Sequence, residues 1–173
     1  MTLKAAIGAT VRRCRLDEQR AILSIINSAA ARYRGVIPAH CWHEPYMSAA
    51  ELADAIDGGV SFWGVDADEG NDKTLAGVMG IQSVKDVTLV RHAYVRPEYQ
   101  GRGIGSLLLH HLETLADRRI LIGTWADATW AIRFYEAQGY ALIPRVETPQ
   151  VLRTYWEIPG QQVDASVVLV KAR

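Results

Sequence analysis

Residues 87–116 have the sequence VTLVRHAYVRPEYQGRGIGSLLLHHLETLA. The pattern predicts a β-branched strand, a proline-bearing turn, a glycine cluster and then an amphipathic helix. Gly101, Gly103 and Gly105 alternate where strand passes into helix, so a ligand can approach the backbone there without meeting side chains. The start of the helix adds unpaired N–H groups and the positive end of the helix dipole. The stretch therefore predicts a binding site for a phosphate-bearing ligand.

Two common nucleotide-binding patterns do not fit this stretch. A Walker loop places Gly-Lys-Ser/Thr before its helix, whereas Gly105 is followed by Ser106 with no lysine. The dinucleotide pattern G-x-G-x-x-G also fails, because its third glycine would be Ser106 or Leu108 in the two registers available. A nucleotide-dependent transferase therefore stays only as a rival interpretation.

The pattern that remains resembles the acetyl-coenzyme A binding motif of the GNAT N-acetyltransferases. That motif has the form V-x-P-x-x-[QR]-[GR]-x-G-[IVL]-[GA]. The residues that fit it are Val95, Pro97, Gln100, Gly103, Ile104 and Gly105. The resemblance implies that the chain binds acetyl-CoA. The alternative is a tight strand–helix turn in which glycine serves packing alone.

Length and composition favour one globular domain. The 173 residues are expected to form a single domain, 1–173, with its core between about residues 9 and 171. Lys plus Arg and Asp plus Glu number 19 each, so we expect neither nucleic acid nor a membrane as a partner. Two cysteines, no apolar run at the start and no stretch of about 18 apolar residues predict a cytoplasmic protein.

Hydrophobic periodicity and capping signals predict a mixed α/β (α+β) fold. The expected helices run from an Asp17 cap to Ala30, from a Ser48 cap with Glu51 in a capping box to Asp57, through the motif helix, over Trp130–Gln138 and over Glu147–Trp156. The expected strands are Ala9–Cys14, Ser61–Asp66, Thr74–Val84, Asp86–Val95, Ile120–Gly123, Tyr140–Ile143 and Ala165–Val170, with a hairpin turn at Asp68–Asp72. The element order resembles the GNAT fold. The resemblance implies a central mixed sheet of about six to seven strands, splayed between strands 4 and 5, with helices on both faces.

A second stretch, residues 131–140, looks like the family's A-x-x-F-Y-x-x-x-G-[FY] segment. In that family the tyrosine commonly protonates the departing thiolate, a role that maps onto Tyr135. A phenol with a pKa near 10 can supply such a proton. The alternative is a core helix in which Tyr135 only packs. The family often has an asparagine three residues before the alanine, where this chain has Ala128, and Asp127 or Thr129 would then take its place.

The resemblance also implies the cofactor contacts. The backbone of Tyr94 and Val95 is expected to pair with the pantetheine amide as an added strand would. The amides that are expected to cradle the pyrophosphate are those of Gln100, Gly101, Arg102, Gly103, Ile104, Gly105 and Ser106. The Arg102 side chain either adds a charge-assisted contact or is simply solvated.

The general base and the acceptor site carry weaker signals. Strand alternation places His92 on the same face as Val90 and Tyr94, where it is either the base or a hydrogen-bonded core histidine. Glu44, with His43, is the other candidate base. In the family the segment between the first two helices walls the acceptor site, so Trp42 and Tyr46 are expected to bind the substrate.

His40, Cys41, His43 and Glu44 also form a compact group of potential metal ligands. Structural zinc sites usually draw on two separated clusters, and no second Cys/His cluster is present in the sequence. We therefore expect no metal.

The combined interpretation is an acetyl-CoA dependent N-acetyltransferase. It would move the acetyl group directly to a primary amine of a small-molecule or amino-acid-like acceptor. The alternatives are a non-catalytic acyl-CoA sensor and a protein N-terminal or lysine acetyltransferase. The resemblance also implies a homodimer.

Overall fold

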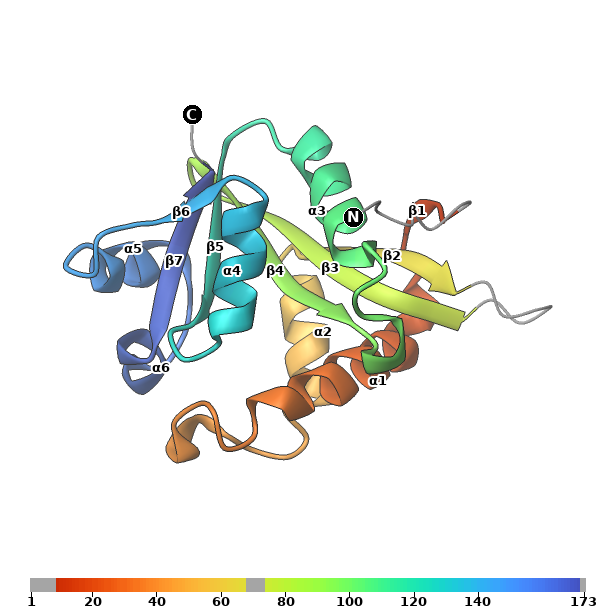
Figure 1. Ribbon diagram of the computed structural model, residues 1–173, viewed down its shortest axis with the longest axis horizontal. Coiled ribbons are helices and arrows are strands. Elements are labelled where there is room, and N and C mark those ends of the chain that lie inside the picture. The colour runs from red at the N-terminus through yellow and green to blue at the C-terminus, as the bar shows by residue number, and fades with distance from the viewer. Residues whose placement is uncertain (1–8, 68–73, 172–173) are drawn as a thin grey trace.

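The computed structural model describes residues 9–67 and 74–171. The strands are β1 Val11–Arg13, β2 Ser61–Ala67, β3 Thr74–Val84, β4 Val87–Val95, β5 Arg119–Trp125, β6 Tyr140–Leu142 and β7 Ser166–Lys171. They form one seven-stranded mixed sheet in the order β1-β2-β3-β4-β5-β7-β6 (Figure 1). The predicted mixed fold and strand number are confirmed, while the hairpin turn predicted at Asp68–Asp72 lies outside the described residues.

Strands β4 and β5 pair in parallel over four residues only. Their register runs from Val87 opposite Arg119 to Val90 opposite Ile122. Beyond this point β4 continues along β3 to Val95, while β5 continues along β7 to Trp125. The two strands therefore separate after Val90 and Ile122, as the predicted splay between strands 4 and 5 requires.

A β-bulge interrupts β4 next to this opening. Val78 of β3 lies opposite Tyr94 and Gly80 lies opposite Arg91, so β4 contains one extra residue there. His92 has a left-handed φ of 52°, which is uncommon for a residue other than glycine. A bulge of this kind changes which face the following side chains occupy.

The bulge corrects one prediction about His92. Val90 packs in the core cluster that contains Leu108. The His92 ring instead stacks on Phe62 at 5.8 Å between centroids, on the opposite face, where Tyr94 also packs. His92 therefore shares a face with Tyr94 as predicted, but not with Val90, because strict strand alternation stops at the bulge.

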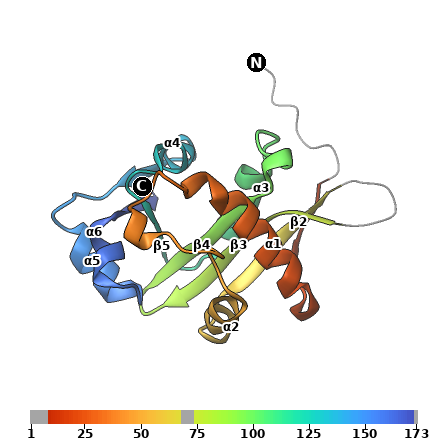
Figure 2. The ribbon, with the colours of Figure 1, turned by 90° about the horizontal axis from the view of Figure 1, so that it is seen from below.

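Helices cover both faces of the sheet (Figures 1 and 2). The helices are α1 Gln19–Ala30, α2 Ala49–Asp57, α3 Ile104–Leu115, α4 Thr129–Ala137, α5 Thr148–Tyr155 and α6 Gly160–Asp164. Residues of α3 and α4 share one core cluster on one face. On the other face, α1 and α2 build a second cluster, and α5 and α6 build a third over the β5–β7 side. None of the described helices is long and apolar enough to cross a membrane.

Helix ends follow the capping signals at α2 and α4 but not at α1. The Ser48 hydroxyl accepts the Glu51 N–H and the Glu51 carboxylate accepts the Ser48 N–H, which confirms the capping box. Gly139, with a φ of 86°, follows the end of α4 as predicted. The Asp17 cap was wrong, because Leu16–Glu18 form a 3-10 turn and the helix begins at Gln19. Helix α6 was not predicted.

The capping box gives a test of the local account. Ser48→Ala should lower the free energy of unfolding by about 1 kcal/mol, because the Glu51 N–H loses its acceptor. Ser83→Ala, at an exposed position of β3, should change it by less than about 0.5 kcal/mol. Urea denaturation of both variants measures the difference, and equal effects would contradict the assigned cap.

Candidate functional site

Two clefts meet where β4 and β5 separate. The smaller, about 360 Å³, lies among β4, the glycine turn, α3 and α4. The larger, about 670 Å³, runs over β3, β4 and β5 between α2 and the α5–α6 region. Figure 2 shows these strands and helices from below. Both clefts are lined by the same five residues at their junction: Tyr33, Ala93, Tyr94, Ala131 and Tyr135. A group bound in one cleft beside these shared residues lies close to a group bound beside them in the other.

The glycine turn between β4 and α3 forms the end of the smaller cleft. Gly101 and Gly103 have φ of 74° and 82°, and a Cβ added at either would meet no atom within 4 Å. Gly103 precedes the first residue of α3, and its carbonyl accepts the Leu107 N–H. The N–H groups of Ile104, Gly105 and Ser106 therefore have no carbonyl partner within the helix. All three of these residues line the cleft, so an anion is favoured at this end.

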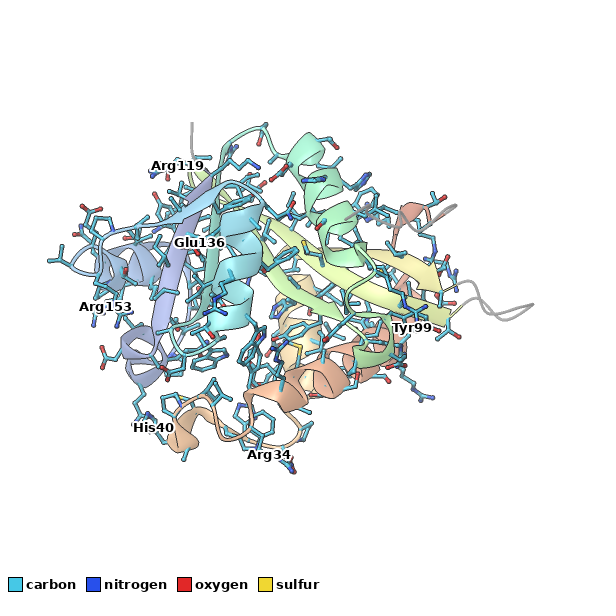
Figure 3. All side chains as sticks on the ribbon, viewed as in Figure 1. Arg34, His40, Tyr99, Arg119, Glu136 and Arg153 are labelled. Carbon is cyan, nitrogen blue, oxygen red and sulfur yellow. The ribbon has the colours of Figure 1, made fainter. Side chains whose placement is uncertain are left out.

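Two side chains of the turn stabilise its backbone through hydrogen bonds. Gln100 donates through Nε2 to the Val95 carbonyl at 3.0 Å. Arg102 donates to the Glu98 carbonyl at 2.9 Å, and its guanidinium lies 5.0 Å from the Tyr99 ring centre. Gln100 and Gly101 line the smaller cleft, but Arg102 is not among its lining residues. Figure 3 shows Tyr99 on this loop, at the start of α3.

The last residues of β4 present a free edge to both clefts. Tyr94 and Val95 pair with Val78 and Gly77 of β3 on one side. On their other side the pairing with β5 has already ended at Val90. Both residues line the smaller cleft, so this edge, which has no strand neighbour, is available to an extended ligand.

Aromatic rings wall the junction of the clefts. Tyr33, Tyr46 and Tyr94 lie 5.5 to 6.4 Å apart between ring centroids. Trp125 donates to the Tyr46 hydroxyl at 2.8 Å. Trp130 stacks on Tyr33 at 5.7 Å and lines the smaller cleft. Tyr33 and Trp130 were not predicted as site residues, because nothing in their local sequence shows that the 3-10 turn after α1 meets the start of α4.

Of the two residues predicted to bind the acceptor, the structure brings one to the larger cleft. Tyr46 lines it. Trp42 packs behind Tyr46, with 5.8 Å between ring centroids, and is not among the lining residues. Trp42 therefore supports the wall instead of forming its surface.

Tyr135 stands at the junction itself. This residue of α4 is 6% exposed and belongs to the core cluster that α3 and α4 form against the sheet. Burial raises the pKa of the Tyr135 phenol above its ordinary value, and so does the nearby Tyr33. The hydroxyl therefore keeps its proton at neutral pH. A buried protonated phenol at this position can donate a proton to a group that becomes negative.

The two candidate bases differ sharply in placement. His92 lines the larger cleft, and its Nε2 is inaccessible to solvent and has no hydrogen-bond partner among the described residues. Burial, and secondly the charge of Arg91, lower the pKa of His92 to about 3. Glu44 forms an ion pair with Arg34, is largely exposed and is not among the lining residues of the cleft. Figure 3 shows Arg34 and His40 on the segment that follows α1.

At the position where the family often has an asparagine, this chain has a buried alanine. Ala128 is fully buried beside Ile37 and Trp125, directly before α4. Asp127 and Thr129 are exposed and do not line the smaller cleft. Neither side chain therefore substitutes for an asparagine contact in that cleft.

No metal centre is evident in the part of the chain that the structure describes. No group of three His, Cys, Asp or Glu side chains is close enough there to hold an ion. His40, Cys41 and His43 instead line the larger cleft, where the His43 ring stacks on Tyr46 and its Nδ1 lies 2.9 Å from the Pro45 carbonyl.

Comparison with known proteins decides the family. The model of the acetyltransferase (GNAT) family matches residues 23–140, which is more than half of the chain. The chain belongs to the GNAT family. This confirms the predicted family, the predicted enzyme class of acyltransferase and acetyl-CoA as its cofactor. A comparison with curated proteins finds no match.

Solved structures of acetyltransferases share the fold of this chain. An acetyltransferase from Streptococcus agalactiae 2603 is 18% identical, with a TM-score of 0.70 over 96% of this chain and 99% of that one. The PaiA N-acetyltransferase from Thermoplasma acidophilum, solved with coenzyme A, is 16% identical, with a TM-score of 0.67 over 96% and 99%. The ribosomal-protein-S18-alanine N-acetyltransferase from Escherichia coli is 16% identical, with a TM-score of 0.65 over 94% and 92%.

The lowered pKa of His92 predicts a pH dependence of stability. Between pH 6.5 and about 3 the unfolded chain protonates this histidine and the folded chain does not, so stability falls as the pH falls. Asparagine suits the left-handed backbone at position 92 and does not titrate. In His92→Asn the free energy of unfolding should therefore fall by about 1 kcal/mol less per pH unit than in the wild type. Denaturant unfolding at pH 6.5, 5.5 and 4.5 measures it, with the exposed His110→Asn as control. Parallel pH profiles for wild type and His92→Asn would contradict the assignment.

Proposed function

We propose that this GNAT protein transfers an acetyl group from acetyl-CoA directly to a primary amine of a small-molecule or amino-acid-like acceptor. The observation that carries the proposal is the meeting of two clefts at Tyr135. One cleft suits a cofactor with a phosphate at the glycine turn, and the other is large enough for a separate acceptor. Two clefts with one junction favour direct transfer within a ternary complex. The cytoplasmic location and the homodimer stay predictions.

The residues of the smaller cleft fit coenzyme A. The N–H groups at the start of α3 suit its pyrophosphate, and the free edge of Tyr94 and Val95 suits an amide-bearing pantetheine arm. A side chain at Gly105 would crowd the cleft wall, since a Cβ there would lie 3.3 Å from the Phe134 ring. Arg102 is held by Glu98, so we assign the anion contacts to backbone amides and not to its guanidinium.

Acetyl-CoA supplies the acetyl group as a thioester, whose acyl carbon the amine attacks. Tyr135 would hold a proton on its hydroxyl at the cleft junction and donate it to the thiolate. Its raised pKa keeps that proton in place until negative charge develops beside it. The Val95 amide is proposed to polarise the thioester carbonyl.

We propose His92, in preference to Glu44, as the group that receives the amine's proton. His92 lines the acceptor cleft, whereas Glu44 is paired with Arg34 outside it. A histidine with a pKa of about 3 is neutral at the pH of the reaction and is a weak base. Activity is therefore expected to rise with pH as the acceptor amine itself loses its proton.

The rival interpretation is a non-catalytic acyl-CoA sensor. Thiol release from acetyl-CoA in the presence of a broad amine panel separates the two functions. The enzyme releases thiol with at least one amine. Binding of acetyl-CoA without thiol release across the panel would favour the sensor.

Tyr135→Phe tests the proposed acid. The variant should lower kcat about 100-fold or more, because a donor for the leaving thiolate is lost, while the affinity for acetyl-CoA changes little. Tyr140→Phe is the matched control, since its hydroxyl donates to Glu113 and lines neither cleft. Steady-state kinetics and calorimetric titration with CoA give the two quantities. An unchanged kcat would remove Tyr135 from this role.

Gly105→Val tests the cofactor cleft. The added side chain would press on Phe134 and narrow the space beside the turn, so the affinity for CoA should fall at least 10-fold. Gly160→Val is the control, because a Cβ at Gly160 would meet no atom within 4 Å. Calorimetric titration with CoA measures both variants. Wild-type affinity in Gly105→Val would show that CoA binds elsewhere.

A further inference from the structure

Arg91 is a charged side chain that the proposed reaction does not use. The bulge in β4 turns Arg91 and His92 to the same face, and both line the acceptor cleft. Arg91 is partly buried, and Nη1 donates to the Gln82 side-chain carbonyl at 3.0 Å. Among the described residues that line this cleft, Arg91 is the only lysine or arginine.

The positive charge of Arg91 lacks a close counter-charge. Among the described residues no carboxylate oxygen lies within 4.0 Å of its guanidinium nitrogens. Burial lowers the pKa of the guanidinium, and the more distant Glu157, which lines the same cleft, acts in the opposite direction. Arginine stays protonated in proteins, so its burial has a cost that a paired anion would offset.

The position of Arg91 sets the length of such a ligand. Because of the bulge, Arg91 lies only two β3 positions from Tyr94, opposite Gly80 and Val78 respectively, which corresponds to roughly 7 Å along the sheet. Its side chain reaches Gln82, which pairs with Leu89, and therefore extends away from Tyr94 and Tyr135. The anion site and the junction of the clefts thus lie about 10 Å or more apart.

We infer that the acceptor is an extended primary amine that carries a carboxylate about 10 Å or more from its amine, and that Arg91 binds this carboxylate. Arginine pairs with carboxylates through two parallel N–H···O bonds. An α-amino acid is too short, because its amine and carboxylate are attached to the same carbon. The acceptor cleft, about 670 Å³, has room for the longer molecule. The inference rests on the proposed function for the identity of the reacting group.

Short glycine peptides are suitable probes, since three extended residues span about 10 Å. Triglycine and triglycine amide differ in charge at the far end while their amine is the same. Calorimetric titration of each into the CoA complex of the wild-type chain measures binding without turnover. Triglycine should bind about 10- to 100-fold more tightly than its amide.

The same titrations on variants assign the difference to Arg91. In Arg91→Gln the preference for the acid should fall to near 1, and Arg91→Lys should restore part of it. Arg153→Gln, an exposed position on α5 labelled in Figure 3, is the matched charge control and should keep the wild-type ratio. If Arg91→Gln does not fold, the ratio of triglycine to triglycine amide affinity in Arg91→Lys and in the wild type still tests the role of Arg91.

Equal binding of acid and amide by the wild type, no binding of triglycine, or a preserved preference in Arg91→Gln would overturn the inference. Thiol release with uncharged alkylamines is measured separately. Release with those amines but no preference for the acid leaves the proposed function intact and removes the role of Arg91. An acid preference in binding without thiol release from any amine contradicts the proposed function and supports the anion site.

Discussion

The site depends on the limited pairing of β4 with β5. The two strands share a parallel ladder only as far as Val90 and Ile122, after which each follows a different neighbour. Backbone groups on the open edge of β4 then lack a strand partner, and unpaired polar groups in a protein interior are costly. A ligand that runs along this edge as an added strand satisfies them. The same separation allows clefts on the two sides of the sheet to meet at Tyr94 and Tyr135.

The bulge at His92 determines which polar side chains of β4 face the acceptor cleft. A left-handed residue other than glycine costs roughly 1–2 kcal/mol, which packing around the bulge must offset. In return, two consecutive side chains, Arg91 and His92, face one cleft, which a regular strand does not allow. Both are partly or largely desolvated, as the lowered pKa values of both groups indicate. The donor side of the site thus rests on glycine backbone, and the acceptor side on one strained position in β4.

The parts of the fold with a local cause were predictable from sequence. The glycine turn, the Ser48 capping box and the glycine after α4 each follow from residues a few positions apart. The bulge has no such signal, since nothing in the sequence around His92 indicates a left-handed φ. Contacts between distant segments were equally hidden: Tyr33 on Trp130, and Glu44 paired with Arg34 outside the cleft. Side-chain direction in the segment between α1 and α2 depends on packing that periodicity does not describe.

The central claim is that donor and acceptor meet at the opening between β4 and β5. A crystal structure of the protein with CoA tests it most directly. We expect the pyrophosphate on the amides of residues 101–106, the pantetheine arm beside Tyr94 and Val95, and the sulfur near the Tyr135 hydroxyl. CoA bound away from this opening, or β4 and β5 paired through it in the complex, would contradict the account.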